Sequence, residues 1–213
     1  MIRPILLAAC AVAALAGCET AAISRAAVDA PTLAPGEPGP LRRAVARLPG
    51  VPDLPAMQWD DQEMGAEWTV ATLAALDAEG AALMSQVPAD VLEYCPSYAR
   101  QSHENRRAFW AGLISAMARQ EGAGSGAVMR VSAAQARSHG CGGAMSDVQA
   151  NLSCAVRIAA RQVITDNAIA ATSGGGAAES RSWRGAARDW LSLRNPARRG
   201  QIANWTRSQS YCR

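Results

Sequence analysis

The clearest pattern of apolar and polar positions in this chain lies between residues 109 and 121. Its large apolar side chains fall at i, i+1, i+4, i+5 and i+8, the spacing that lays one stripe along an α-helix; they are Phe109, Trp110, Leu113, Ile114 and Met117. One further step of four residues reaches Glu121, after which a glycine-rich stretch cannot continue the helix cheaply. Ser102 is placed to cap its start. The pattern predicts a buried helix that ends at a carboxylate.

Two further segments carry helix signals on either side of this stretch. The pattern of residues 67–76 predicts a first amphipathic helix, broken at Gly80. Ser132 and Gln135 have the spacing of a capping box, which predicts a short helix over residues 133–139.

The C-terminal half continues the helical pattern. Ser146 and Gln149 repeat the capping-box signature and begin the longest predicted helix, whose apolar stripe continues to about residue 164. Residues 173–176 mark a flexible break. We expect short closing helices beyond it, which contain Trp183, Trp190, Leu191, Leu193, Ile202 and Trp205. Because no convincing run alternates between apolar and polar positions, the fold class predicted is predominantly α-helical.

The N-terminus has the pattern of a secretory signal peptide over residues 1–17. One positive charge precedes an apolar run over residues 5–15, which is too short to span a bilayer. The run ends in Leu15-Ala16-Gly17-Cys18, which resembles the lipobox of bacterial lipoproteins. That resemblance implies that Cys18 becomes a lipid-modified N-terminus, and the alternative is an ordinary cleavage site that happens to precede a cysteine.

Residues 18–55 are rich in alanine, proline and glycine and show little periodicity, so we interpret them as a lipid-anchored linker. Residues 56–213 form the folded domain in this interpretation, and their length suffices for one hydrophobic core. Glu19 is not the aspartate that commonly retains lipoproteins at the inner membrane. The expected location is therefore the periplasmic face of the cell envelope, at the outer membrane.

Four cysteines remain besides Cys18 in a compartment that is oxidising: Cys95, Cys141, Cys154 and Cys212. An even number predicts two disulfides with three possible connectivities. Because Cys141 and Cys154 are close along the chain, we expect them to pair with each other and leave Cys95 for Cys212. The competing interpretation is a zinc site, but the chain has no pair of cysteines with two residues between them, and His103 and His139 lie in unrelated segments.

The charge of the chain argues against nucleic-acid binding. All of its positive residues are arginine, the net charge is only +3, and the arginines are not interleaved with aromatic residues. We expect no nucleic-acid partner, no metal, no cofactor and a monomeric protein.

Glu121 is the residue in the sequence that looks suited to acid–base chemistry. A carboxylate at the C-terminal end of a buried helix stripe faces low dielectric and the negative end of the helix dipole, which both favour its protonated form. Such a group can act as a general acid near neutral pH. Taken alone, a glutamate in this position is more often a surface residue.

The order of the residues that follow resembles the soluble lytic transglycosylase family, whose domain is lysozyme-like. In that family a helix ends in the catalytic glutamate followed by serine, a loop carries a Gly-Leu-Met-Gln-like motif, and a later helix opens with asparagine and an apolar residue. Here Glu121 takes the glutamate's place, residues 128–131 lie where the second motif should be, and Asn151-Leu152 matches the third. The resemblance covers residues 59–212 in outline and is sharpest over residues 109–155.

The chain departs from the family pattern at three positions. Gly122 replaces the serine, while Ala127 and Arg130 stand for the glycine and glutamine of the loop motif. The resemblance assigns the catalytic role to Glu121 and sugar contact to Met129 and Asn151. The alternatives are that Met129 fills the core and that Asn151 is a polar residue flanking the helix stripe. Arg130 is expected either to bind a carboxylate of the substrate or to pair with Glu121 and abolish its use as an acid.

The resemblance implies a lytic transglycosylase that acts on peptidoglycan glycan strands. Glu121 would cleave the β-1,4 bond between N-acetylmuramic acid and N-acetylglucosamine and leave a 1,6-anhydro product, with no paired carboxylate required. The alternative is a catalytically inactive lipoprotein of the same fold that binds peptidoglycan or an envelope partner.

Overall fold

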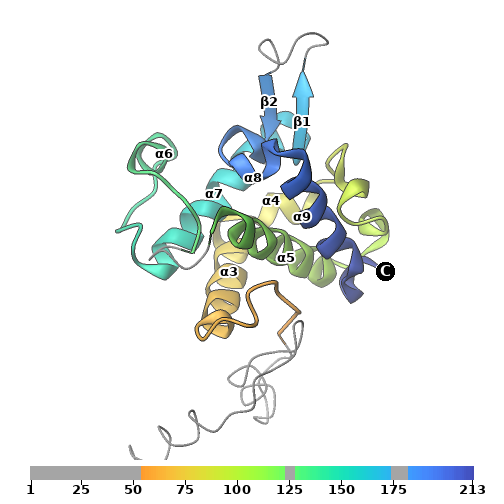
Figure 1. The fold of residues 1–213 in the computed structure, drawn as a ribbon, viewed down its shortest axis with the longest axis horizontal. Helices are drawn as coiled ribbons and strands as arrows, with labels where there is room; N and C mark the ends of the chain where they lie inside the picture. The colour runs from red at the N-terminus through yellow and green to blue at the C-terminus, as the bar shows by residue number, and fades with distance from the viewer. Residues whose placement is uncertain (1–53, 123–127, 174–181) are drawn as a thin grey trace, which may run out of the picture. The chain divides into compact units, whose positions relative to one another are not determined.

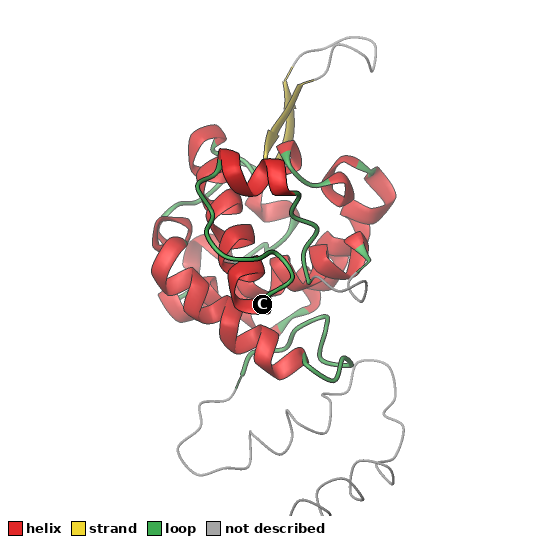
Figure 2. Cartoon of the chain, turned by 90° about the vertical axis from the view of Figure 1, so that its left-hand side faces the viewer, coloured by secondary structure: helices red, strands yellow, loops and turns green. Residues whose placement is uncertain are grey.

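The computed structural model describes residues 54–122, 128–173 and 182–213 of the chain. This part is predominantly helical, with a small antiparallel hairpin that stands out from the helices (Figures 1 and 2). The α-helices are α3 (Gly65–Glu79), α4 (Ala81–Ser85), α5 (His103–Glu121), α6 (Ala133–Ser138), α7 (Val148–Asp166), α8 (Leu191–Arg194) and α9 (Pro196–Ser208). Short 3₁₀ turns are η1 (Val91–Glu93), η2 (Tyr98–Arg100), η4 (Ala186–Arg188) and η5 (Ser210–Cys212).

Helix α5 is the central element, and the sequence pattern predicted both of its ends. The Ser102 hydroxyl accepts a hydrogen bond from the N–H of Asn105 at 3.2 Å, as an N-cap does. At the other end Gly122 adopts a left-handed conformation with φ 86°, which stops the helix directly after Glu121. The apolar stripe of α5 is buried, and the helix packs against α3, α4, α8 and α9.

The C-terminal segment approaches α5 closely at Gly112. A Cβ atom at this position would lie 2.1 Å from the hydroxyl oxygen of Tyr211, so only glycine leaves room for that ring. The same hydroxyl donates to the carbonyl of Ala56 at 3.2 Å. Tyr211 thus ties η5 both to α5 and to the chain that enters the domain.

Helix α7 is as long as α5, and it packs along α3. Its apolar stripe lies in the core as predicted, but its N-cap is Asp147 rather than Ser146. The Asp147 carboxylate accepts from the N–H of Ala150 at 2.8 Å, and a carboxylate at this end also suits the helix dipole. The capping box of α6 forms as expected between Ser132 and Gln135.

The hairpin corrects the expectation that Trp183 lies in a helix. Strand β1 (Ala170–Ser173) pairs with β2 (Ser182–Gly185), with Ala170 opposite Gly185. The flexible break expected over residues 173–176 starts at Ser173, which is the last residue of β1, and residues 174–176 lie outside the described residues. Each strand has only four residues, too few for a convincing alternation.

A buried carboxylate, Asp166, fixes the base of this hairpin. It accepts from the N–H of Gly185 at 2.7 Å and from Arg188 at 2.7 and 2.9 Å. The hydrogen bond from Arg188 lowers the pKa of Asp166, against the opposing effect of burial and with further help from the Gly185 N–H. Gly185 itself has φ 66°, and any Cβ there would collide with the carbonyl of Ala168.

Two disulfides staple the domain, and both pair as the sequence suggested. Cys95 joins Cys212 with a Cα–Cα distance of 5.0 Å, and Cys141 joins Cys154 at 5.4 Å. The first holds the chain end to the turn after η1, and the second holds the loop after α6 to α7.

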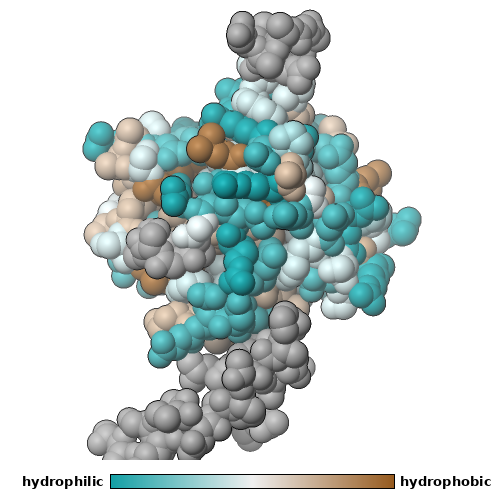
Figure 3. All heavy atoms as spheres, in the orientation of Figure 1, coloured by the Kyte–Doolittle hydropathy of each residue, from teal (hydrophilic) through white to brown (hydrophobic). Residues whose placement is uncertain are grey.

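The predicted signal peptide, Cys18 and nearly all of the linker lie outside the described residues. Over the described ranges, none of the helices combines the length and the apolar character needed to cross a bilayer. The face shown in Figure 3 is mainly hydrophilic, as expected where helix surfaces meet water.

Candidate active site

Glu121 lies at the end of α5, and the residue as a whole is 8% exposed. Its Oε1 atom accepts a hydrogen bond of 2.7 Å from the backbone N–H of Ser192, in the first turn of α8. No donor among the described residues reaches Oε2. The carboxylate is therefore held on one side by the protein and keeps acceptor positions on the other.

A groove of about 420 Å³ opens beside this carboxylate. One wall comes from the end of α5, another from the loop before α6 and from α6 itself, and a third from the segment that leads into α8. The lining residues are Glu121, Met129, Arg130, Val131, Ser132, Gln135, Asp189 and Leu191. Glu121, Met129 and Arg130, which the sequence singled out, thus meet in one groove.

Asn151 organises this groove from beneath. Its Oδ1 accepts from the N–H of Met129 at 2.8 Å, and its Nδ2 donates to the carbonyls of Met129 at 2.9 Å and Met145 at 3.1 Å. The side chain is fully buried, so these three bonds leave it no surface for a ligand. We therefore assign Asn151 a positioning role in place of the sugar contact expected from the sequence.

Met129 is also fully buried, while Arg130, the next residue, is exposed. Asn151 holds the backbone of Met129 by two hydrogen bonds, and the Met129 side chain packs inside the groove wall without an exposed contact surface. A direct sugar contact by Met129 would need this side chain to move.

Arg130 reaches over the end of α5 without pairing with the glutamate. A Cβ atom on Gly122 would lie 3.5 Å from Nη2 of Arg130, which places the guanidinium beside the helix end. No ion pair between Arg130 and Glu121 occurs among the described residues. The arrangement that would disable Glu121 as an acid is thus absent from this part of the chain.

Asp189 is a second carboxylate in the groove, and sequence reasoning missed it. Gln135 donates to its Oδ1 at 3.2 Å and Gln162 to its Oδ2 at 2.8 Å, while Nε2 of His139 lies 3.8 Å from Oδ1. Gln135 is itself oriented because its Oε1 accepts from the N–H of Ser132 at 2.9 Å. Through these contacts Asp189 connects α6 and α7 to the segment that leads into α8.

A second groove, of about 450 Å³, lies between α3 and the start of α7. It is slightly larger, and its two carboxylates are Glu67 in the first turn of α3 and the helix cap Asp147. We place the candidate active site in the first groove, beside Glu121, because it combines a buried carboxylate with a cation and oriented polar side chains.

No group of three or more histidine, cysteine, aspartate or glutamate side chains gathers as a potential metal site within the described ranges. The groups that line the groove include a carboxylate, Glu121, which can transfer a proton, and a guanidinium, Arg130, which can bind an anion.

The structure resembles solved structures of a protein named DslA. The wild-type form has a TM-score of 0.66 and 28% identity, over 74% of this chain and 97% of that chain. Two glutamate-to-glutamine variants of DslA match over the same shares, with TM-scores of 0.65 and 0.64 and identities of 28% and 27%. No protein-family model matches the sequence, and no curated protein sequence matches it.

Proposed function

We propose that this chain is a lipid-anchored peptidoglycan lytic transglycosylase with a lysozyme-like domain, and that Glu121 is its acid and base. The observation that carries the proposal is a buried glutamate whose carboxylate is oriented by a backbone N–H and borders a groove of about 420 Å³. A carboxyl group held at the edge of a groove suits general acid–base catalysis, because a substrate in the groove can come within hydrogen-bond reach of it.

In the proposed reaction Glu121 donates its proton to the glycosidic oxygen between N-acetylmuramic acid and N-acetylglucosamine. The bond from C1 to that oxygen breaks, and an oxocarbenium-like state develops. Ionised Glu121 then takes the proton of the C6 hydroxyl, whose oxygen bonds to C1 and closes the 1,6-anhydro ring. Glu121 ends the cycle protonated, so the same group serves both half-reactions and needs no second carboxylate as nucleophile.

Two of the DslA structures are glutamate-to-glutamine variants, and this supports testing a glutamate as the reactive group of this chain. Such a substitution keeps the shape of the side chain and removes its ability to transfer a proton. Two disulfides support an oxidising compartment, which agrees with a periplasmic site of action. The lipid on Cys18 would hold the enzyme at the outer membrane, and the linker would let the domain reach the cell wall.

Arg130 gives the groove a positive group near Glu121. Its guanidinium is exposed and free of ion pairs among the described residues, so it can form a bidentate pair with a carboxylate of the substrate. The lactyl and peptide carboxylates of peptidoglycan supply such groups. Arg130 would thus orient the strand while Glu121 reacts.

A non-catalytic peptidoglycan-binding protein is the second candidate. The observation in its favour is that Gly122 and Arg130 depart from the family motif beside Glu121. Such a protein would keep the groove and its affinity for glycan strands and would release no product.

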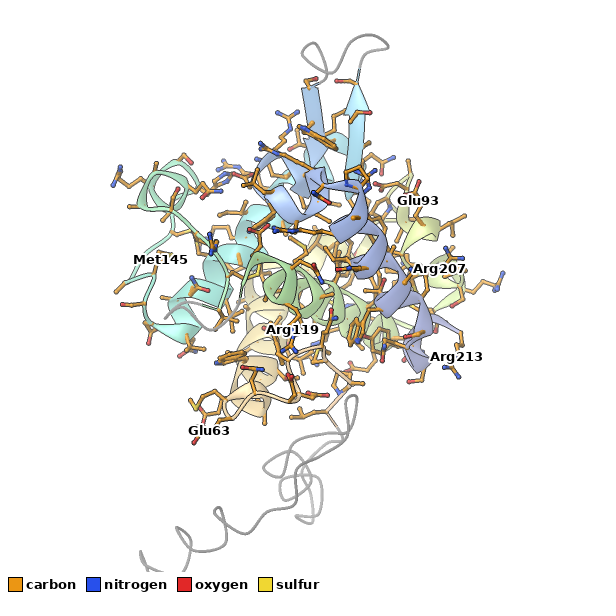
Figure 4. The ribbon with its side chains drawn as sticks, viewed as in Figure 1. Glu63, Glu93, Arg119, Met145, Arg207 and Arg213 are labelled. Carbon is orange, nitrogen blue, oxygen red and sulfur yellow. A yellow bond between two sulfur atoms is a disulfide. The ribbon has the colours of Figure 1, made fainter. Side chains whose placement is uncertain are left out.

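The deciding experiment is muropeptide analysis of purified sacculi after incubation with the wild type, Glu121→Gln and Glu93→Gln. Glu93 is a matched control because it is an exposed glutamate on η1 that does not line the groove. Figure 4 shows it on the opposite side of the domain from Met145, whose carbonyl accepts from Asn151. We expect the wild type and Glu93→Gln to release 1,6-anhydromuropeptides, and Glu121→Gln to be slower by about 10²–10⁴-fold. Binding to sacculi without release by the wild type would establish the non-catalytic alternative.

A further inference from the structure

Ser192 carries a buried, unpartnered hydroxyl in the residue that donates to the Glu121 carboxylate. The residue is fully buried, and its backbone N–H donates to Glu121 Oε1 at 2.7 Å. Its hydroxyl, however, has no hydrogen-bond partner among the described residues. Burying a hydroxyl without a partner opposes folding, so a native structure that retains one calls for a physical explanation.

The position of the hydroxyl supplies that explanation. It belongs to the same residue as the N–H that holds Glu121, and rotation about the Cα–Cβ bond moves it among three staggered positions. A carboxylate has about four acceptor sites, of which Glu121 uses one within the described residues. The carboxylate is thus an acceptor of sufficient capacity close to the unpartnered donor.

We propose that Ser192 is a positioning residue for Glu121, and that its hydroxyl bonds to the carboxyl group during the reaction. The proposal rests on the proposed function. The Ser192 N–H fixes one oxygen throughout, and the hydroxyl rotates to donate to the carboxylate once Glu121 has given its proton to the substrate. The hydroxyl bond therefore exists only between the two proton transfers and is absent from the resting protein.

The end of α5 itself cannot take this role. Gly122 directly follows Glu121, has no side chain and turns away in a left-handed conformation. Support for the carboxylate has to come from another element, and α8 provides it because its first turn has N–H groups that no helix carbonyl uses. Glu121 is 71 residues from Ser192 along the chain, so only the fold brings them together.

A second buried serine provides a matched control for the test. Ser115 is also fully buried and lies on α5, but its hydroxyl is satisfied. It accepts from the N–H of Gln58 at 3.0 Å and donates to the carbonyl of Gly112 at 2.8 Å. Ser192→Ala and Ser115→Ala therefore remove the same atom from two different settings.

The experiment measures the melting temperature, the maximal rate of anhydromuropeptide release and the sacculus concentration at half-maximal rate. We expect Ser192→Ala to keep the wild-type melting temperature or exceed it, because no bond is lost. Its maximal rate should fall about ten- to a hundred-fold, with an unchanged half-saturating concentration, since a hydrogen bond to an ionised group is lost only in turnover. Ser115→Ala should show the reverse, with wild-type turnover and a melting temperature lower by about 2–6 °C.

The outcomes separate this proposal from the function on which it rests. If the wild type releases no product, the proposed function fails and the role of Ser192 fails with it. If the wild type is active and Ser192→Ala turns over at the wild-type rate, only the positioning role is wrong. A lower melting temperature for Ser192→Ala together with wild-type turnover would also overturn it, because the hydroxyl would then have a purely structural partner.

Discussion

Replacing Asn151 by alanine is a direct test of how the groove beside Glu121 is built. The Asn151 side chain makes three hydrogen bonds to backbone atoms, two to Met129 before α6 and one to Met145 in the loop that precedes α7. It is fully buried, so water cannot replace it without entering the core. The substitution should both destabilise the domain and release the Met129 segment of the groove wall.

The expected magnitude follows from the groups left without partners. The Met129 N–H and the Met145 carbonyl lose their bonds, whereas the Met129 carbonyl still accepts from the N–H of Val131 at 3.0 Å. Each buried polar group left unpaired costs about 1–3 kcal/mol. Carbonyls tolerate this better than N–H groups, and a neighbouring loop can relax, so we expect a total near 3–5 kcal/mol. For a domain of this size the melting temperature should fall by about 6–20 °C.

Thermal unfolding of the oxidised protein, followed by circular dichroism, measures this loss. Asn204→Ala is the control, because Asn204 lies exposed on α9 and its side chain makes no hydrogen bond to the described residues. That change should stay within about 0.5 kcal/mol of the wild type. If Asn151→Ala also stayed within 1 kcal/mol, the three bonds would not support the loop, and the positioning role assigned to Asn151 would be refuted.

Two further predictions concern the remaining cross-links of the domain. The pKa of Asp166 is lowered, chiefly by the hydrogen bond from Arg188. The stability that Asp166 contributes is therefore fully present above the unfolded-state pKa of about 4, and it is lost as the pH falls through the lower folded-state pKa. Asp166→Asn should lose about 1–3 kcal/mol at pH 7 and less on acidification, and equal losses in melts at pH 7 and pH 2 would contradict this. The chain-entropy model assigns about 5 kcal/mol to Cys95–Cys212, which closes a separation of 117 residues, and about 3 kcal/mol to Cys141–Cys154, which closes 13. Denaturant unfolding of the two double alanine variants should show that order, and the reverse order would contradict the model.

Features set by neighbouring residues were predictable from the sequence. The cap at Ser102, the helix end at Glu121 and the capping box at Ser132 each depend on residues within one turn of the helix. The disulfide between Cys141 and Cys154 was predictable for the same reason, since a short separation limits where two cysteines can lie. At Ser146 this local reasoning chose the wrong cap, because Asp147 fits the same role and also suits the helix dipole.

Contacts between distant segments account for what the sequence could not supply. The hairpin has too few residues to show an alternating pattern, and it is anchored by Asp166 on α7, whose partner Gly185 lies 19 residues further along the chain. Asp189 had no spacing signal, because its partners Gln135 and Gln162 come from two other helices.

The candidate active site combines both kinds of information. The helix pattern could place Glu121 at the end of a buried stripe, and that local fact survives in the structure. It could not tell whether the carboxylate would be paired with Arg130, exposed or oriented, because each of these outcomes depends on where α8 and the loop before α6 come to lie. The N–H of Ser192 donates to Glu121. Every residue except proline carries such an N–H, so the sequence gives no signal for this contact. The orientation of Glu121 by a backbone donor of a distant helix can therefore be seen only in the folded structure. Ser192→Ala tests whether the side chain of that donor residue also contributes to turnover.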